Sequence, residues 1–346
     1  MAVTSTSALQ EQELLDAARG GDEDAFRRVV ERHHAELHAH CYRMLGSLQD
    51  AEDALQETLL RAWQGLAGFG GRSSTGTWLY RIATNVCLNA IARRPKRVLP
   101  MDYGPPTPRQ AEPGEPLVES VWIEPYPDER LGLAEGYAAP AARYEQREAV
   151  ELAFIAALQH LPARQRAVLI LREVLGFSAR EVSETLETTV VSVNSALQRA
   201  RKTLDERLPE QSQQDTLRLL GDEQVREVVE RYVDAWERGD VEALRALLAE
   251  DATFSMPPWA AWWRGRETIA GFAKDAHEFC AEARATPVRA NGQVAIAYYH
   301  LDADTGRYTP AAIDVITFEG ALIKEITAFI TAQIFPRFGL PPELAP

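Results

Sequence analysis

Apolar residues recur at every third or fourth position over residues 10–98, as they do along helices with one buried face. The spacing predicts that this segment is helical throughout. Asp22 or Asp24 is expected to cap its second helix, and residues 46–50 to form a break and a new cap. The apolar positions are Leu14, Leu15, Ala18, Phe26, Val29, Val30, Leu37, Cys41 and Leu45, then Ala54, Leu55, Leu59, Ala62 and Trp63.

The same repeat returns in residues 143–209, where it ends in a helix-turn-helix pattern at residues 176–202. Ser178 is expected to cap the first helix of the pair, with Glu181 completing a capping box. The positions expected to face inward are Val182 and Leu186 on the first helix, and Val190, Val193, Leu197, Ala200 and Leu204 on the second.

Residues 222–346 begin with the same helical repeat and then change to a period of two. The alternation predicts strands near residues 251–258, 294–301, 311–318 and 322–329. Helices followed by a curved sheet indicate an α+β cone. The chain is therefore expected to be multidomain, with two all-α helical domains, the second carrying the helix-turn-helix, and a C-terminal α+β domain.

Residues 99–142 lack any such repeat and are rich in proline and acidic residues. They hold nine prolines, eight acidic residues and two arginines, which is the composition of an extended linker. Residues 121–127 concentrate Trp122, Ile123 and Tyr126 within it. A plain tether needs no such side chains, so this short motif is expected to dock on a surface.

Composition limits the compartment and the partners. The chain has 346 residues, a formal net charge of −14 and only three cysteines, which are far apart. Such cysteine usage favours a reducing cytoplasm. No run is apolar enough to span a membrane, and residues 1–12 lack a signal-peptide core. The negative charge is unsuited to unaided DNA binding, so a large partner is expected to supply most of the grip.

An acidic helix and a basic, aromatic helix follow one another near the N-terminus. Residues 50–63 place Asp50, Glu52, Asp53, Gln56 and Glu57 opposite the apolar stripe, and residues 77–85 lead into the basic run 93–97. For an isolated helix, a solvated acidic face would be the ordinary interpretation. In order and spacing, however, the pair resembles the polymerase-binding and promoter-melting helices of extracytoplasmic-function sigma factors. The resemblance implies that Asp53, Gln56 and Glu57 dock on core RNA polymerase.

The same resemblance assigns contacts with the melted −10 element to the loop at residues 69–78 and the helix after it. Such a loop receives a base flipped out of the duplex. The family usually has a bulky apolar residue where this chain has Thr75. Trp78 could equally pack in the core, whereas Asn85 offers a donor and an acceptor on an exposed face. The expected −10 contacts are Arg72, Ser73, Ser74, Thr77, Trp78, Asn85 and Arg93.

The helix-turn-helix is expected to read the −35 duplex, since its second helix presents short polar residues and then basic ones. A surface helix of random polarity is the alternative. This chain has Glu187 where the family's turn has glycine, and it has Asn194 and Ala196 where many relatives carry bases. The expected contacts are Ser192, Asn194, Ser195, Gln198, Arg199 and Lys202.

The last domain resembles the SnoaL-like branch of the NTF2 fold, and we interpret it as regulatory. Such a cone can hold a pocket for a small-molecule ligand, although its aromatic residues could simply fill the core. Asp314 lies within an apolar strand and His277 on a helix, but no catalytic set can be assembled from them. The candidate pocket residues are Trp259, Trp262, Trp263, Phe272, Tyr298, Phe329 and Asp314.

These inferences predict a sigma factor with four segments, no catalysis and no cofactor. The expected partners are core RNA polymerase and promoter DNA. The alternatives are a DNA-binding module fused to a small-molecule enzyme, and a stand-alone repressor. His34, His38 and Cys41 lie at helical spacing, but without a fourth ligand they predict no metal site. The expected segments are region 2 at 10–98, a linker at 99–142, region 4 at 143–209 and the SnoaL-like domain at 222–346.

Overall fold

The computed structural model describes residues 2–71, 73–108, 113–117, 121–131, 147–279 and 283–345, with the side chains of residues 2–9 and 277–279 left out. The chain forms two compact units. Unit 1 is Met1–Pro95 with Leu158–Glu206, and unit 2 is Lys96–Ala157 with Arg207–Pro346. Among the described helices, none has the length and apolar character needed to cross a membrane.

The N-terminal part of unit 1 is helical, as its apolar repeat predicts. Short polar side chains start two of the helices: Asp22 accepts the N–H of Ala25, and Ser47 accepts the N–H of Asp50. Gly46 ends the helix before Ser47 in a left-handed conformation, with φ of 69°. The elements are α1 (Ala2–Arg19), α2 (Glu23–Glu31), α3 (His34–Leu45), α4 (Leu48–Gly65), the 3₁₀ turn η1 (Leu66–Gly68) and α5 (Thr75–Ile91).

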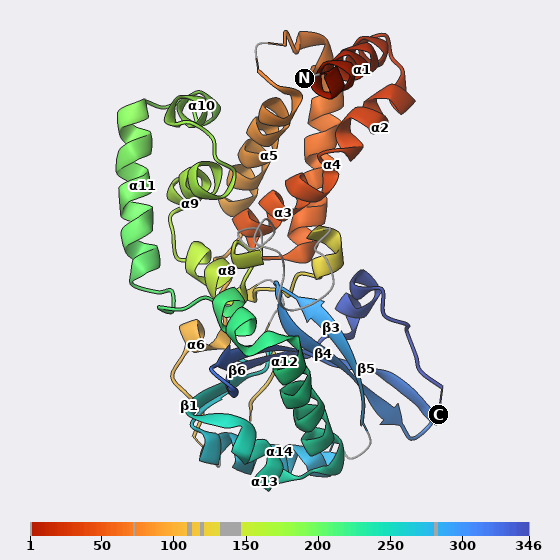
Figure 1. The fold of residues 1–346 in the computed structure, drawn as a ribbon, viewed down its shortest axis with the longest axis vertical. Coiled ribbons are helices and arrows are strands. Elements are labelled where there is room, and N and C mark those ends of the chain that lie inside the picture. The colour runs from red at the N-terminus through yellow and green to blue at the C-terminus, as the bar shows by residue number, and fades with distance from the viewer. Residues whose placement is uncertain are drawn as a thin grey trace. The chain divides into compact units, whose positions relative to one another are not determined.

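Helices α3, α4 and α5 pack against one another around the core of this part (Figure 1). Leu37, Leu48 and Leu79 are completely excluded from solvent. A polar pair is also buried there, since the Nε2 atom of His40 lies 3.0 Å from the Oγ1 atom of Thr84. Burial lowers the pKa of His40 to about 3, so this imidazole is neutral and serves the core.

The outward face of α4 differs from the prediction at Asp50. We expected Asp50 to be exposed, but its carboxylate is buried and forms an ion pair with Arg94. The helical repeat could not reveal this pair, because Arg94 lies far away in the sequence. Trp63, expected in the buried stripe, is half-buried and packs against Phe26, with ring centroids 5.1 Å apart.

The helix-turn-helix forms at the predicted place in unit 1. Ser178 and Glu181 make the expected capping box, in which each side chain accepts the other residue's backbone N–H. The second helix begins at a cap formed by Thr189, whose side chain accepts the N–H of Ser192. The elements are α8 (Leu152–Gln159), α9 (Ala163–Leu169), the π turn η4 (Ile170–Val174), α10 (Ala179–Thr185) and α11 (Val190–Asp205).

A buried arginine joins the two helical parts of unit 1. The Arg166 guanidinium donates to the carbonyl of Met44, at the end of α3, and to the side chain and carbonyl of Gln159. It donates also to the carbonyl of Leu161. Burial lowers the pKa of Arg166 to about 10, which leaves it charged at neutral pH. Several charge-assisted bonds to backbone oxygens therefore hold α9 against α3.

Unit 2 contains a six-stranded mixed sheet in the order β2-β1-β6-β5-β4-β3. β1 and β6 are parallel, and the other neighbours are antiparallel. The sequence predicts β1, β4, β5 and β6 but not β2, which is only three residues long, nor β3, which lacks alternation. The strands are β1 (Leu248–Ser255), β2 (Trp262–Arg264), β3 (Ala283–Ala290), β4 (Gln293–Asp302), β5 (Arg307–Glu319) and β6 (Leu322–Phe329).

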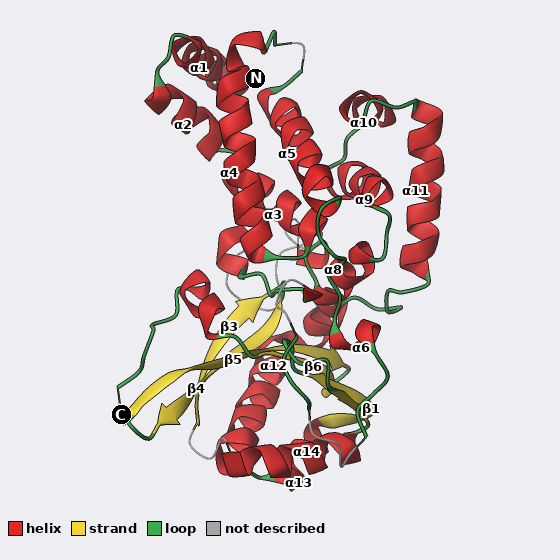
Figure 2. Ribbon diagram, turned by 180° about the vertical axis from the view of Figure 1, so that it is seen from behind, coloured by secondary structure: helices red, strands yellow, loops and turns green. Residues whose placement is uncertain are grey.

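Helices cover one face of this sheet (Figure 2). The longest of these helices, α12 (Gln213–Arg238), is kinked at Gly221, where φ is 76°. It contributes to the core on both sides of the kink, through Leu217 before it and Val225 and Tyr232 after it. Trp263 stacks on Phe272 with centroids 4.0 Å apart, and Phe254 lies 5.2 Å from the Phe272 ring. The remaining elements are α13 (Val241–Leu247), α14 (Arg266–Phe279) and the 3₁₀ segment η5 (Ala332–Phe338).

Much of the acidic linker is folded onto the C-terminal domain. We expected an extended segment with one docking motif, and the motif does dock: Trp122, Ile123 and Tyr126 are all buried. Trp122 bridges to Val98, and the Tyr126 N–H donates to the Asn291 side chain over 2.9 Å. The linker also contains two short turns, α6 (Pro100–Tyr103) and η3 (Asp128–Leu131).

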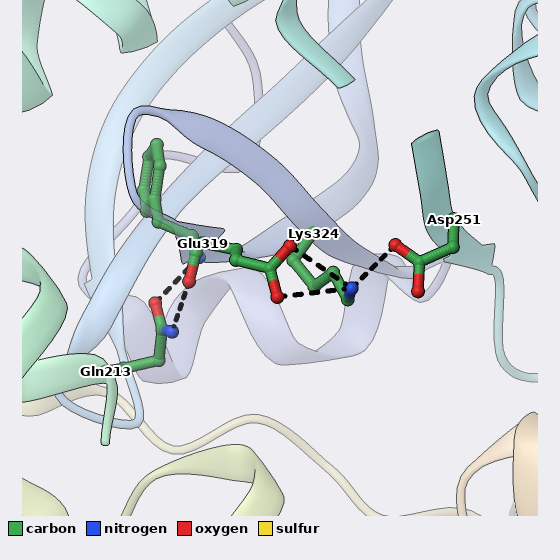
Figure 3. Close-up of polar contacts among 5 residues, drawn as sticks. Gln213, Asp251, Glu319 and Lys324 are labelled. Carbon is green, nitrogen blue, oxygen red and sulfur yellow. Dashed lines mark hydrogen bonds and ion pairs between the residues drawn. The ribbon is translucent and has the colours of Figure 1, made fainter. Parts of the chain in front are cut away.

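The β5–β6 turn is anchored on both sides (Figure 3). On one side, the Gln213 side chain pairs with the backbone N–H and carbonyl of Phe318 at 2.7 and 2.8 Å. On the other, the Lys324 ammonium lies 2.6 Å from Asp251 and 3.3 Å from Glu319. The start of α12, the turn and β1 are thereby fixed together.

The turn of the helix-turn-helix holds a residue in an unfavourable conformation. Glu187 has φ of 50°, in the left-handed region that glycine adopts most easily. The Thr188 N–H bonds to the carbonyl of Ser183 at 2.9 Å, which is the pattern of a helix end that requires such a residue. The Glu187 carboxylate lies 3.4 Å from the Arg81 guanidinium, and this exposed ion pair contributes little to stability.

We therefore expect Glu187→Gly to stabilise the helix-turn-helix by about 1 kcal/mol, because it relieves this backbone conformation. Amide hydrogen exchange over α10 and α11 should slow by about fivefold. Gly176→Ala is the matched control. Gly176 has φ of 70° and an added Cβ would meet no atom within 4 Å, so this change should speed exchange through backbone strain alone. Unaltered exchange in Glu187→Gly would contradict the prediction.

Candidate functional site

The outward face of α4 carries the acidic group singled out in the sequence. Asp53 and Gln56 are exposed and Glu57 is half-exposed. Asp53 accepts a bond from Gln49 at 3.2 Å, and Glu57 pairs with Arg61 at 2.6 Å. Both interactions lie at the surface, where such pairs contribute little and exchange easily. The carboxylates are therefore accessible to a partner.

Leu60 belongs to this face and was missed by the sequence reasoning. Its side chain is 51% exposed, although it lies beside the predicted stripe residue Leu59. The sequence did contain a signal for Leu60, because it is an apolar residue that lies outside the helical repeat. An exposed leucine among carboxylates suits a protein-binding face better than a purely solvated one.

The residues expected at the melted DNA surround the start of α5. Ser73 and Ser74 are exposed, and Ser74 caps the helix by accepting the Thr77 N–H. The Ser74 and Thr77 hydroxyl oxygens are 2.9 Å apart. Thr75, which replaces a bulky residue of the family pattern, is buried. Arg72 lies outside the described residues.

Trp78 and Asn85, on α5, are half-buried, and Arg93, just after the helix ends, is exposed. The Trp78 ring stacks on Phe69 with centroids 4.6 Å apart and planes 23° apart. Core packing therefore accounts for one face of this indole. Asn85 keeps part of its amide accessible, as a residue that reads bases requires.

The outward face of α11 carries the polar residues expected to read duplex DNA. Ser192, Asn194, Gln198, Arg199 and Lys202 are exposed, and Ser195 is half-exposed. The inward stripe is also as predicted, with Val193, Leu197, Ala200 and Leu204 buried.

One position on α11 was predicted wrongly. Val190 was expected to face inward, but it is 41% exposed, and the next residue, Val191, is 75% exposed. Val190 is the first residue of the helix, and the buried stripe begins at the next position of the repeat, Val193.

The candidate pocket residues of the C-terminal domain fall into two environments. Trp259 and Trp262 donate their indole N–H groups to the linker carbonyls of Gly114 and Gly104, at 3.1 and 2.8 Å. Trp263 is instead buried against Phe272. The two tryptophans thus bind the linker through their indole N–H groups, although the Trp259 side chain also packs against the core of the domain.

Asp314 and Tyr298 lie together in that interior. The Asp314 carboxylate accepts the Tyr232 hydroxyl at 2.9 Å. Burial raises the pKa of Asp314 to about 7, and the bond from Tyr232 opposes part of that rise. The Tyr298 hydroxyl is buried without a hydrogen-bond partner among the described residues, and burial with the nearby charge of Asp314 raises its pKa.

A groove of about 230 Å³ lies elsewhere on this domain, between α12 and β3. Val229, Val233 and Pro287 form its apolar part, and Glu230, Asp234 and Glu237 its acidic part. None of the candidate pocket residues lines it. The small-molecule ligand expected from the sequence therefore stays a prediction.

The histidines and cysteine at helical spacing do not converge. His34 is exposed, whereas His38 and Cys41 are buried in the helical core. Within the described ranges, no three histidine, cysteine or acidic side chains are placed to share a metal ion. His277 lies in α14, as expected, but its side chain is outside the described set.

Three protein-family models match the chain in the order of these elements. Residues 29–97 match sigma-70 region 2, and residues 145–204 match sigma-70 region 4. Residues 229–326 match a SnoaL-like domain. The helical face of α4, the α5 surface and the helix-turn-helix all lie within the two sigma matches.

The chain is 41% identical over 334 residues to the ECF RNA polymerase sigma factor SigG of Mycobacterium tuberculosis, covering 94% of this chain and 86% of SigG. This chain belongs to the ECF sigma factor family. It is also 30% identical over 192 residues to SigM of the same organism, covering 56% of this chain and 81% of SigM. The crystal structure of the M. tuberculosis sigma factor SigJ is similar to this structure, with a TM-score of 0.57 and 20% sequence identity. The match covers 89% of this chain and 96% of SigJ, so the two proteins share a fold.

As a sigma factor, the protein is a non-enzymatic subunit that binds core RNA polymerase and promoter DNA. Its C-terminal α+β domain is SnoaL-like, as the alternating strands and the helices before them predict. The sequence therefore identifies both the family and the fold class.

The buried Asp314 gives this sigma factor a pH-dependent stability. Its pKa rises from 3.8 to about 7 on folding, so the folded chain holds a proton that the unfolded chain releases. The contribution to stability is fully present below about pH 4 and is lost as the pH rises through about 7. Asp314→Asn should remove this pH-dependent contribution. Between about pH 4 and pH 8, the free energy of unfolding of the variant should therefore rise by a few kcal/mol relative to that of wild type.

Urea unfolding of unit 2 would be monitored by tryptophan fluorescence at a series of pH values. The exposed Asp304→Asn change serves as the control and should show no such trend. A difference between Asp314→Asn and wild type that stays constant with pH would show that Asp314 titrates normally.

Proposed function

We propose that this ECF sigma factor docks on core RNA polymerase through the exposed face of α4. The observation that supports the assignment is a set of accessible polar groups, Asp53, Gln56 and Glu57, with Leu60 exposed among them. An apolar centre within a charged rim is the usual make-up of a protein interface. Because the polymerase is cytoplasmic, the protein acts there.

We infer further that promoter DNA is read at two places on unit 1. The −10 strand would contact Ser73, Ser74, Thr77, Trp78, Asn85 and Arg93 around α5, together with Arg72. The −35 duplex would contact the exposed face of α11. The supporting observation is that this face presents hydroxyls and amides first and then arginine and lysine, which suit base edges and phosphates respectively. The segments would be region 2 at 10–98, a linker at 99–142, region 4 at 143–209 and the SnoaL-like domain at 222–346.

The C-terminal domain would regulate this activity by holding the linker. In sigma factors that this chain resembles, the linker threads the polymerase cleft. Here Trp122, Ile123 and Tyr126 are buried in unit 2, and Trp259 and Trp262 bind further linker carbonyls. Asp128 adds a buried ion pair with Arg289 at 3.1 Å. A linker bound in this way must be released before it can enter polymerase, which opposes assembly of the holoenzyme.

An enzymatic role for this domain has weaker support. Asp314, whose pKa burial raises to about 7, is hydrogen-bonded to Tyr232 within the aromatic core. The ring stack of Trp263 and Phe272 occupies the same core.

The docking proposal predicts that Asp53→Lys with Glu57→Lys weakens binding to core polymerase by at least about tenfold. The change removes two interface charges and adds repulsion in their place. Affinity would be measured by titrating labelled full-length protein with purified core enzyme. Glu227→Lys with Asp304→Lys makes the same charge change at exposed positions of unit 2 and should leave affinity within about twofold. Equal affinities for both double variants would remove α4 as the docking face.

The regulatory proposal predicts that loosening the linker raises transcription. Trp259→Phe with Trp262→Phe keeps an aromatic ring at each position. It removes the two indole N–H bonds to the linker, each of which contributes about 1 kcal/mol. We expect run-off transcription at subsaturating sigma factor to rise by about three- to tenfold, with the same start sites. Trp236→Phe, in the same domain, is the control for the loss of an indole.

Point changes in the full chain are preferable to truncation at residue 208, because truncation would remove the surface on which the linker folds. Transcription that stays level or falls in the double variant, while Trp236→Phe behaves as wild type, would exclude a restraining role of the linker contact.

A further inference from the structure

Two exposed valines begin the helix that presents the −35 contacts. Val191 is 75% exposed and Val190 is 41% exposed, while the other large apolar residues of α11 are buried. Valine is a poor helix former and gains nothing in solvent. Single exposed apolar residues are ordinary, but two adjacent ones at the start of a helix proposed to read DNA suggest a contact with that DNA.

Val191 is aligned with the polar face of α11. Residues three, four and seven positions apart share one side of a helix, and from Val191 these are Asn194, Ser195 and Gln198. Lys202 continues the same line one further turn along. In Figures 1 and 2, α11 lies at the outer side of unit 1, and Asn194 and Gln198 on this helix are exposed.

The chemistry of valine limits what it can recognise in DNA. The side chain neither donates nor accepts a hydrogen bond. In the major groove the apolar group that distinguishes one base is the C5 methyl of thymine. The N-terminal turns of a recognition helix are the part that reaches the base edges, and Val191 is in the first turn. Its neighbours Asn194 and Gln198 carry amides of the kind that pair with adenine, so one helix face suits adjacent A·T pairs.

We propose that Val191 selects thymine at one position of the −35 element, through contact between its methyl groups and the thymine methyl. The proposal rests on the assignment of α11 as the −35 reader. Val190 is also exposed, but it lies outside the line of residues that Val191 shares with Asn194, Ser195 and Gln198. Burying about one methyl group should make the preference three- to fivefold in affinity.

The test uses the full-length protein with core polymerase and duplexes selected from a pool randomised over the −35 element. Each thymine of the selected sequence is replaced singly by deoxyuridine, which lacks only the methyl group, and binding is measured by titration. We expect wild type to lose three- to fivefold in affinity at one thymine, and Val191→Ala to bind the two duplexes equally. 5-Methylcytosine at that position should restore binding relative to cytosine for wild type alone.

Leu219→Ala is the matched control, because Leu219 is also 75% exposed but lies on α12 in unit 2; it should keep the wild-type deoxyuridine penalty. Arg199→Ala separates the inference from its premise. If Arg199→Ala weakens duplex binding but Val191→Ala keeps the deoxyuridine penalty, the −35 assignment stands and the valine contact is overturned. If neither variant affects duplex binding, both fail. If Val191→Ala weakens binding to polymerase without DNA, the valine contacts protein and the inference is overturned.

Discussion

Unit 2 depends on a buried polar network at the turn between β3 and β4. The Asn291 side chain accepts the Tyr126 N–H and donates to the carbonyl of Val150, at 2.9 and 2.7 Å. The Gly292 N–H donates to Asp128, and its carbonyl accepts the Gln214 side chain. Each bond contributes only about 1 kcal/mol, but leaving such a buried group without a partner costs about 1–3 kcal/mol. The network is therefore stable only when all of its members are in place.

The partners of this turn come from three distant parts of the chain: the linker, the segment that leads into α8, and the start of α12. Glu151 belongs to the same region, since its carboxylate accepts the N–H groups of Gln213 and Gln214 at the first turn of α12. Burial raises the pKa of Glu151 to about 7, while those two bonds oppose the rise. The linker between the two sigma regions is thus part of the C-terminal fold. A partner that takes up the linker would have to break a cooperative set of contacts, and this supports our proposal that the SnoaL-like domain regulates the sigma factor.

Local signals predicted the parts of the fold that are set by a few neighbouring residues. The capping box of Ser178 and Glu181, the Gly46 break and the apolar stripe of α11 are all of this kind. Errors arose where a distant residue decides the outcome. Asp50 is buried because Arg94 neutralises it, and Trp259 and Trp262 face the linker because Gly114 and Gly104 offer carbonyls. Val190, the first residue of α11, is exposed, and the buried stripe begins at Val193. The expected contacts on α4 and α11 are exposed or half-exposed, but sequence spacing could not reveal Leu60 or Val191.

The charges on α11 affect how this helix would read the −35 element that we propose for it. Arg201 pairs with Glu173 at 2.8 Å, and Lys202 lies 3.9 Å from Glu206. These exposed pairs are individually weak, yet each lowers the positive potential available to phosphates. Binding that releases few counterions depends only shallowly on salt and adds little non-specific affinity. If α11 reads the −35 element as we propose, close contacts with base edges would supply most of its discrimination in a chain of net charge −14, and the polymerase would supply most of the non-specific affinity for DNA.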